Sequence, residues 1–265
     1  KNQNLAPDIY LRVVPVSLRG QTLVFEADDE EVVDWAVKMR RFREEDKMDN
    51  LLEEGKVSKE HVLALAEKIA QFHQGLPIPP EAAKYGSFEN VQRIWKENFE
   101  QGRELVGTGA INTELIERSE KKIEVSLKIN HLLFGKRIRD GKVLDCHGDF
   151  HSGNVIIEKK EKKKGEEVEP FDALEFNKAY SVHDVASEVG FMVMDLDFHG
   201  RSDLAKAFAE KYVELTGDGE MIEAGLLDFY KAHRAWVRGK IEAWQGDYKK
   251  ANKYFSLAES YLQSL

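Results

Sequence analysis

The chain has 265 residues, of which 33% are charged and 42% hydrophobic, with 19 Gly and 6 Pro. This composition excludes a disordered chain, which would be less apolar, and a fibrous chain, which would be richer in Gly and Pro. The net charge of −9 argues against general binding to nucleic acid or to an anionic membrane surface.

A single cysteine, Cys146, excludes an internal disulfide and a multi-cysteine zinc or iron–sulfur site. It fits a reducing compartment, so we expect a cytoplasmic protein. The longest dense apolar stretch, Val189 to Met194, has six residues and is too short to cross a membrane. The chain starts at Lys1 with neither an initiator Met nor a signal-peptide pattern, so we expect it to begin part-way into a longer protein.

Residues 9 to 39 are predicted to form an antiparallel meander of three short strands. Two apolar runs are separated by the turn signal at Arg19-Gly20, and the acidic turn from Asp28 to Glu31 leads to a third run over residues 32 to 39. The composition changes at residues 40 to 43, and helical patterns dominate from Glu44.

Amphipathic helices are predicted next. Ser58 is the expected N-cap of the first long helix, which should end near Gly75 and Pro77. Further helices are predicted over residues 88 to 105, 111 to 134 and the whole region from residue 182 to the C-terminus.

Residues 143 to 176 are predicted to return to β-structure. Short apolar strands at 143–144 and 155–157 flank a polar loop, and residues 158 to 169, mostly Lys and Glu, are predicted to form an extended solvated hairpin turn. Residues 171 to 176 are expected to form the returning strand.

The most informative segment is the polar loop from Asp145 to Asn154. Burying Asp, His and Asn side chains without partners is costly, so such a loop between apolar strands indicates a site. Asp149 and Asn154 lie five residues apart, the spacing of the catalytic Asp and the metal-binding Asn in the H-R-D-x-x-x-x-N loop of protein kinases. The returning strand would bring Asp172 beside the amide oxygen of Asn154, so that two hard oxygen ligands meet at one Mg²⁺.

The sequence H-G-D-F-H-S-G-N at 147–154 resembles the H-G-D-x-H-x-x-N signature of the aminoglycoside phosphotransferase and choline kinase family. F-D-A-L-E-F-N at 171–177 resembles the metal-binding strand of that family, and H-D-V-A-S-E at 183–188 resembles the start of its later helix. I-A-Q-F-H at 69–73 is similar to a family helix that ends in histidine. The wording M-D-L-D-x-x-G-R at 194–201 is similar to a branch of uncharacterised bacterial aminoglycoside-phosphotransferase-like proteins.

The resemblance implies an α+β, protein-kinase-like fold with two lobes. Residues 1–43 would be the remainder of a truncated β-rich nucleotide lobe with its hinge, and residues 44–265 the helical lobe with the catalytic loop and the metal-binding strand. The implied activity is Mg²⁺-dependent transfer of the γ-phosphoryl group of ATP to a hydroxyl group of a small molecule, with no nucleic-acid or membrane partner.

Carried over by position, the resemblance implies that Asp149 is the catalytic base and that Asn154 and Asp172 bind Mg²⁺. His147 would orient the loop. At the hinge, nucleotide contacts are assigned to Met39 and Arg41.

Asp184 would brace the loop from the start of a helix. Ser181-x-x-Asp184 also fits a capping box, so a plain capping role for Asp184 stays open. Glu175 is expected to be a solvated strand-end carboxylate rather than a ligand of metal or of a cationic substrate.

One departure from the family pattern leaves a second function open. The family places a Gly-rich turn and a phosphate-binding strand lysine before the hinge, and neither is visible in this sequence. Lys38 in A-V-K-M imitates the lysine motif, but its strand leads directly into the expected hinge. A non-catalytic, pseudokinase-like binding or scaffold module is therefore the alternative. A two-metal phosphoesterase is rejected because its D-x-H and G-D-x-H elements would overlap within residues 145–151.

The remaining polar residues are predicted to be structural. Cys146 is expected to be a small buried filler, and Asp195, Asp197 and His199 to form a solvated helix end. Ordinary core or surface roles are expected for the dispersed histidines, which include His61, His73, His131, His183 and His233.

Overall fold

A computed structural model describes residues 1–27, 31–159 and 166–265 as an α+β protein. Its strands are β1 (Tyr10–Arg19), β2 (Thr22–Phe25), β3 (Glu31–Met39), β4 (Val143–Asp145), β5 (Val155–Lys159), β6 (Glu166–Pro170) and β7 (Val182–Asp184). Its α-helices are α1 (Asn2–Leu5), α2 (Met48–Glu53), α3 (Lys59–Gly75), α4 (Ala82–Gly86), α5 (Phe88–Arg103), α6 (Thr113–Ile129), α7 (His131–Arg139), α8 (Lys178–Ser181), α9 (Val185–Phe198), α10 (Ser202–Thr216), α11 (Glu220–Glu223), α12 (Leu226–Trp244) and α13 (Tyr248–Leu262). Short 3-10 turns are η1 (Glu44–Asp46) and η2 (Ser152–Asn154).

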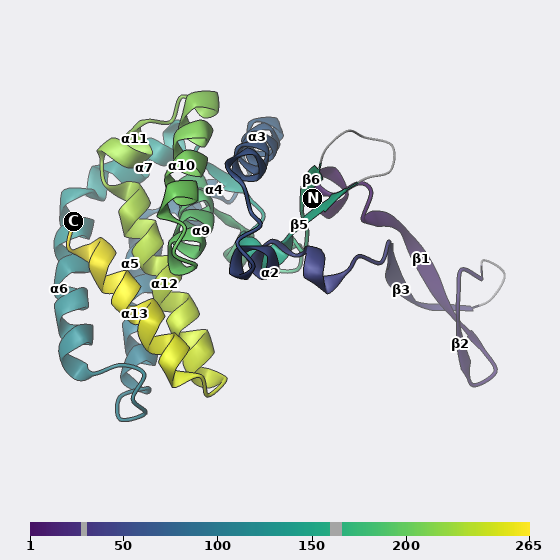
Figure 1. Cartoon of the computed structure of the whole chain (residues 1–265), viewed down its shortest axis with the longest axis horizontal. Coiled ribbons are helices and arrows are strands. Elements are labelled where there is room, and N and C mark those ends of the chain that lie inside the picture. The colour runs from purple at the N-terminus through teal and green to yellow at the C-terminus, as the bar shows by residue number, and fades with distance from the viewer. Residues whose placement is uncertain (28–30, 160–165) are drawn as a thin grey trace.

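The N-terminal strands form a three-stranded antiparallel sheet in the order β2–β1–β3. Antiparallel pairing is confirmed, but the predicted meander is wrong, because β3 pairs with β1 rather than with β2. The acidic turn at residues 28–30 lies outside the described residues. Figure 1 shows this sheet extending away from the helical body.

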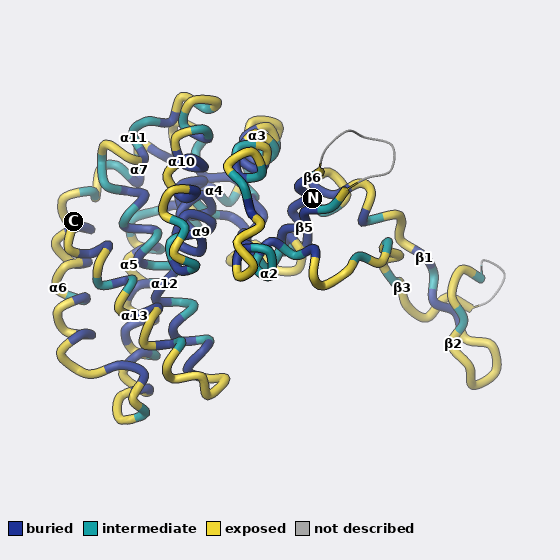
Figure 2. The backbone as a smooth tube through the Cα atoms, viewed as in Figure 1, coloured by how far each residue is buried: buried dark blue, intermediate teal, exposed yellow. Residues whose placement is uncertain are grey.

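Much of the sheet is exposed to solvent (Figure 2), and one of its exposed faces carries apolar side chains. Val13 lies directly opposite Val37 and Pro15 opposite Trp35, and the side chains of Val13, Trp35 and Val37 are all more than half exposed. Burial on this sheet is concentrated at Val14, Val16 and Ser17 of the central strand. The sheet therefore adds little to the main core.

The core of the helical body is built around α9. Every residue of α9 except Asp197 is buried, as expected for a helix that is apolar on all sides. Its main neighbours are α12 and α10, and the same hydrophobic cluster reaches α3, α5, α6 and α13. α9 therefore provides a rigid base for the polar loop that follows β4.

The predicted start of the first long helix is confirmed. Ser58 is the N-cap of α3, and its backbone N–H donates to Nδ1 of His61 at 3.2 Å. The helix ends at Gly75 as expected. The single helix predicted over 111–134 is wrong, because the chain leaves helical geometry at Asn130 (φ −94°, ψ 9°) between α6 and α7. Asn competes for local backbone hydrogen bonds and is a poor residue for a helix interior.

Two small antiparallel strand pairs shape the region after α7. β5 and β6 form a hairpin, as predicted, but its solvated turn does not span residues 158 to 169: residues 158–159 and 166–169 belong to the strands, and Val168 and Glu169 are buried. Residues 160–165 lie outside the described ones. The returning strand is Glu166–Pro170, so the strand predicted at 171–176 is wrong; that segment is a loop in which Asp172 has a φ of +63°. Residues 182–184, predicted to be helical, form β7 and pair with β4. No described helix is long and apolar enough to cross a membrane.

Candidate functional site

Two buried carboxylates of α9 hold the backbone of the polar loop. Glu188 accepts hydrogen bonds from the N–H groups of His147 (2.7 Å) and Gly148 (2.8 Å). Asp195 accepts one from the N–H of Ser152 (2.8 Å). Because residues seven apart lie on the same face of a helix, the two acids face one loop. The prediction that Asp195 belongs to a solvated helix end is wrong, since it is 3% exposed.

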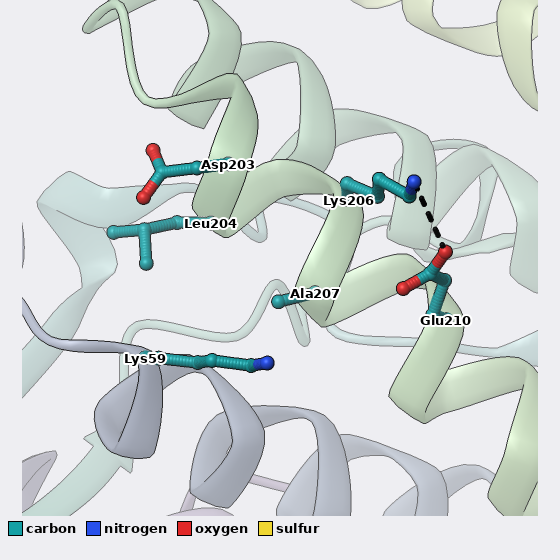
Figure 3. A pocket seen from close by; sticks show the side chains of 6 residues that line it. All are labelled: Lys59, Asp203, Leu204, Lys206, Ala207 and Glu210. Atoms are coloured by element: carbon teal, nitrogen blue, oxygen red, sulfur yellow. Dashed lines mark ion pairs between the residues drawn. The ribbon is translucent and has the colours of Figure 1, made fainter.

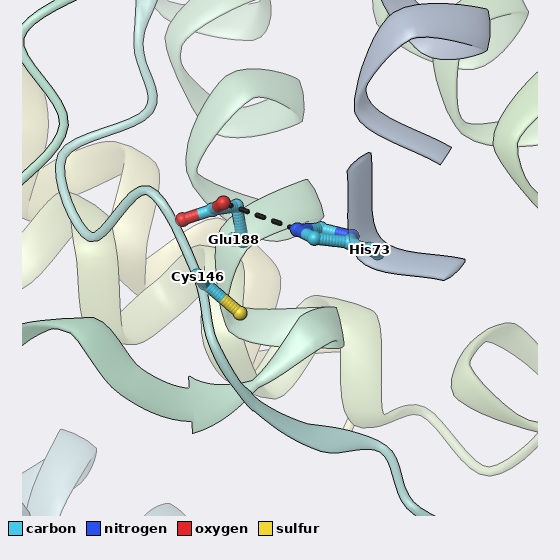
Figure 4. A group of neighbouring side chains, drawn as sticks. All are labelled: His73, Cys146 and Glu188. Atoms are coloured by element: carbon cyan, nitrogen blue, oxygen red, sulfur yellow. Dashed lines mark hydrogen bonds and ion pairs between the residues drawn. The ribbon is translucent and has the colours of Figure 1, made fainter. Parts of the chain in front are cut away.

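Glu188 also lies close to two histidines, of which Figure 4 shows His73. Its Oε1 lies 3.1 Å from Nε2 of His73, whose Nδ1 lies 2.8 Å from the hydroxyl of Tyr212. Nε2 of His183 lies 3.7 Å from Glu188 Oε2. Burial raises the pKa of Glu188, but the hydrogen bond from His73 and the neighbouring histidines outweigh it and hold the pKa far below its usual range. Glu188 is therefore ionised and anchors α3, α9 and the loop together.

Cys146 lies beside this cluster, with His73 and Glu188 close enough to share a metal ion (Figure 4). Both ring nitrogens of His73 and both oxygens of Glu188 already have partners within the protein. Burial raises the pKa of the Cys146 thiol well above its usual value, which disfavours the thiolate that a metal requires. The prediction that Cys146 is a buried filler is confirmed.

Asp149 and Asn154 are in direct contact. Nδ2 of Asn154 donates to both the backbone oxygen and Oδ2 of Asp149, each at 3.0 Å. Nε2 of His151 lies 3.6 Å from the same Oδ2, and the Asp149 side chain is 40% exposed. Burial raises the pKa of Asp149, but the His151 ring and the positive charge of Arg234 outweigh it and hold the pKa at about 2. Asp149 is thus an accessible, ionised carboxylate at neutral pH.

His147 ties the loop to the segment after β6. Its Nδ1 accepts a hydrogen bond from the N–H of Asp149 at 3.3 Å, so Nε2 carries the proton and donates to the backbone oxygen of Phe171 at 2.8 Å. Burial lowers the pKa of His147, which keeps this neutral tautomer. The geometry fits the predicted loop-orienting role.

Gly148 allows the sharp turn between His147 and Asp149. Its φ is +92°, and a Cβ at this position would lie 3.0 Å from the backbone oxygen of Tyr180. Only glycine adopts this conformation in this space without strain. The turn directs successive backbone N–H groups toward Glu188 while leaving the Asp149 side chain partly exposed.

Asp172 is brought next to Asn154 by backbone contacts. The N–H of Phe171 donates to the oxygen of Asn154 at 2.9 Å, and the N–H of Leu174 donates to the oxygen of His147 at 2.8 Å. Asp172 lies between these two anchors, and its own N–H donates to the Tyr10 hydroxyl at 2.9 Å. Asp172 has a φ of +63°, which is uncommon for a residue other than glycine. Where such residues do occur, they cluster at functional sites.

The donors near Asp172 fit the chemistry of Mg²⁺. Asn154 uses its amide nitrogen to bind Asp149, which leaves the amide oxygen available as a ligand. The Asp172 side chain is exposed, and within the described ranges its carboxylate has no hydrogen bond or ion pair. Amide and carboxylate oxygens are ligands that Mg²⁺ prefers. Asn154 and Asp172 are therefore the residues that would hold it.

Asp184 lies apart from these contacts. Its Oδ1 accepts the N–H of Ala186 at 2.8 Å, so it is the N-cap of α9, the role left open by the sequence. Its carboxylate also pairs with buried Arg137 at 2.7 and 2.8 Å, and Arg137 binds Asp218 as well. Glu188, one turn later, makes the loop-bracing contacts expected of Asp184.

Of the two predicted hinge residues, Arg41 lines a pocket away from the polar loop and Met39 does not. The pocket has a volume of about 520 Å³ and lies between residues 40–43, α2, α3 and the β5–β6 hairpin, while Met39 ends β3 with 40% exposure. No residue of the polar loop lines this pocket, and the nucleotide-contact roles of Met39 and Arg41 stay predictions. A second pocket of about 380 Å³ lies between α3 and α10, lined by Lys59 and α10 side chains, away from all predicted site residues (Figure 3).

Glu175 lies at the edge of the same segment and is exposed, as expected. Its Oε1 accepts a hydrogen bond from the backbone N–H of Asn2 at 3.2 Å. The side chain of Asn2 in turn holds the backbone of Ala173, accepting its N–H at 2.7 Å. The N-terminal segment thus packs on the loop that carries Asp172.

The residues missed from the sequence are Glu188, Asp195 and Arg234. The first two carried a usable signal, because an acid inside the apolar run from 185 to 196 must be buried and therefore needs partners. Arg234 comes from α12, and nothing in its local sequence indicates that its charge acts on Asp149.

Comparison with known proteins yields distant relatives of unknown activity. The chain is 30% identical over 206 residues to uncharacterized proteins of Mycobacterium tuberculosis and Mycobacterium bovis. The match covers 78% of this chain and 40% of each relative, so the chain spans less than half the length of these proteins. No protein-family model matches the chain. No solved structure matches it either.

Proposed function

We propose that this chain carries the catalytic centre of a Mg²⁺-dependent phosphotransferase with a protein-kinase-like fold, which moves the γ-phosphoryl group of ATP to a hydroxyl group of a small molecule. The observation that carries the proposal is the contact between Asp149 and Asn154 in a loop whose backbone is fixed by Glu188 and joined to the Asp172 segment. The single cysteine supports a cytoplasmic setting.

Asp149 is the proton acceptor in this proposal. The acceptor hydroxyl oxygen forms the new bond to the γ-phosphorus, the bond from that phosphorus to its bridging oxygen breaks, and ADP leaves with the electron pair. The hydroxyl proton goes to Asp149. A pKa of about 2 suits a residue that mainly orients the hydroxyl, because phosphoryl transfer through a loose transition state needs little deprotonation early in the reaction.

Asn154 and Asp172 would hold the ion. When bound, Mg²⁺ would neutralise the charge of the phosphate oxygens. The contribution of the protein is position: Asn154 is fixed against Asp149, and Asp172 is held between two backbone anchors and Tyr10. Such positioning supplies much of the rate enhancement in phosphoryl transfer.

Calorimetric titration with Mg·ATP tests this proposal. Asp172→Ala is expected to weaken Mg·ATP binding at least about 10-fold, since even residues that only support metal ligands are worth that much. The matched control is Asp203→Ala, an exposed aspartate on α10 that pairs with Arg201 and should leave binding unchanged. Equal binding by the wild type and Asp172→Ala would remove Asp172 from the metal site.

The environment of Lys38 favours the second candidate, a non-catalytic binding module. The Lys38 side chain is 45% exposed on the sheet and pairs with Glu26 at 2.6 Å. Within the described part of the chain, it has no contact with the polar loop. Absence of Mg·ATP binding to the wild type at every Mg²⁺ concentration would favour this candidate over the phosphotransferase.

A further inference from the structure

Arg234 of α12 lies against α9 and β7. Its Nη2 lies 3.3 Å from Nε2 of His183, and its Nε lies 3.4 Å from the backbone oxygen of Ser187, both weak contacts for a charged group. The guanidinium lies over the ring of Phe191, 4.8 Å from its centroid. It is partly buried at the contact between α9 and α12.

Among the residues that the structure describes, the charge of Arg234 has no direct counter-ion. The other arginines that are buried or partly buried all have a carboxylate partner: Arg40 with Glu158, Arg137 with Asp184, Arg201 with Asp203 and Arg238 with Glu242. Arg234 forms no ion pair with a described carboxylate. The charge of Glu188 acts on Arg234, but both oxygens of Glu188 are taken by loop N–H groups and His73. Desolvating a guanidinium without a partner is costly, so this placement points to an anion that binds from outside.

The contacts that connect Arg234 to Asp149 indicate which molecule would carry this anion. The ring of Phe191, which Arg234 covers, packs against the His151 ring at 5.2 Å, and His151 lies 3.6 Å from Asp149. The side-chain amide of Asn154 binds the same carboxylate of Asp149. The backbone of Asn154 is hydrogen-bonded to the segment that carries Asp172, where Mg²⁺ and ATP would bind. The contacts therefore connect Arg234 to Asp149 through Phe191 and His151 rather than through the metal-ligand segment. The acceptor alcohol must also reach Asp149. The contacts through His151 do not involve the metal ligands.

We propose that Arg234 binds a carboxylate or phosphate group of the acceptor, so that the substrate is an anionic alcohol rather than an amine-bearing one. The proposal rests on the phosphotransferase function and names its substrate class. Arg is suited to this task because its planar fork can bind either anion through two hydrogen bonds. Burial lowers the pKa of Arg234, and the charges of Glu188 and Asp149 offset this only in part, so a bound anion would further favour the charged guanidinium.

The test is calorimetric titration of the 265-residue protein with four small alcohols in the absence of nucleotide: glycerol 3-phosphate, glycerate, glycerol and ethanolamine. We expect at least one of the two anionic alcohols to bind 10-fold or more tightly than glycerol, and Arg234→Gln to abolish that difference. Arg234→Lys should retain part of it. The control is Arg139→Gln, an exposed arginine on α7 without a carboxylate partner among the described residues, which should bind like the wild type. Circular dichroism checks that each variant is folded.

Three results would overturn the proposal: tighter binding of ethanolamine than of the anionic alcohols, a preference for anions that survives in folded Arg234→Gln, or no binding of either anion to the wild type. Weaker Mg·ATP binding in Arg234→Gln with unchanged anion binding would also overturn it, by assigning the guanidinium to the nucleotide. If Arg234 binds anions but Mg·ATP never binds, the phosphotransferase function fails while the anion site stands.

Discussion

Replacing Asp149 by asparagine is expected to lower phosphoryl transfer about 10²- to 10⁴-fold, the usual contribution of a positioned proton acceptor. The Mg·ATP affinity should stay within about twofold, because removal of one carboxylate oxygen leaves the proposed ligands Asn154 and Asp172 intact. The measurement is single-turnover formation of ADP in the presence of the anionic alcohol that binds best, alongside calorimetric Mg·ATP titration.

Asp140→Asn is the matched control for this variant. Asp140 is exposed at the end of α7 and pairs with Lys136, so its loss should leave the rate unchanged. Unchanged turnover in Asp149→Asn would remove Asp149 as the base. A loss of Mg·ATP binding as large as the loss of rate would instead place Asp149 among the metal ligands.

Replacing Glu188 by alanine is expected to lower the free energy of unfolding by about 3–5 kcal/mol, as for other buried charges whose partners are left unpaired. The substitution strands the N–H groups of His147 and Gly148 and removes the partner of His73. Urea denaturation at pH 7 measures the loss. Glu210→Ala, on the exposed face of α10, is the control and should change stability by less than about 0.5 kcal/mol. A loss below about 1 kcal/mol for Glu188→Ala would show that the loop is held by other contacts.

The same carboxylate predicts a pH dependence. Because the folded-state pKa of Glu188 is far below its usual range, its contribution to stability is complete above about pH 4.5, near the unfolded pKa. The contribution is lost progressively as the pH falls below that value. Glu188→Ala should therefore show a flatter decline of stability in acid than the wild type.

Local patterns were sufficient for the loop and for most helices. The cap at Ser58 and the apolar period after it depend on neighbours in sequence, and α3 begins where they indicate. Likewise, the five-residue spacing of Asp149 and Asn154 was enough to predict that they act together, and the structure joins them by a direct hydrogen bond.

Contacts set by packing could not be predicted in the same way. The pairing of β3 with β1 is non-local, and the same apolar runs fit a meander equally well. The apolar residues after Pro170 resembled a strand, but the positive φ of Asp172 turns the chain within that segment. Glu188 meets the loop only because α9 packs beside it, and Arg234 meets α9 only because α12 packs against that helix. A one-dimensional pattern does not contain either contact.

Paramagnetic relaxation by Mn²⁺ in the presence of ATP, read from backbone amide NMR signals, would locate the divalent cation directly. We expect selective broadening around Asp149, Asn154 and Asp172, and its disappearance when excess Mg²⁺ is added. Broadening confined to other parts of the chain, such as the exposed acids of α10, would contradict a cation held between Asn154 and Asp172.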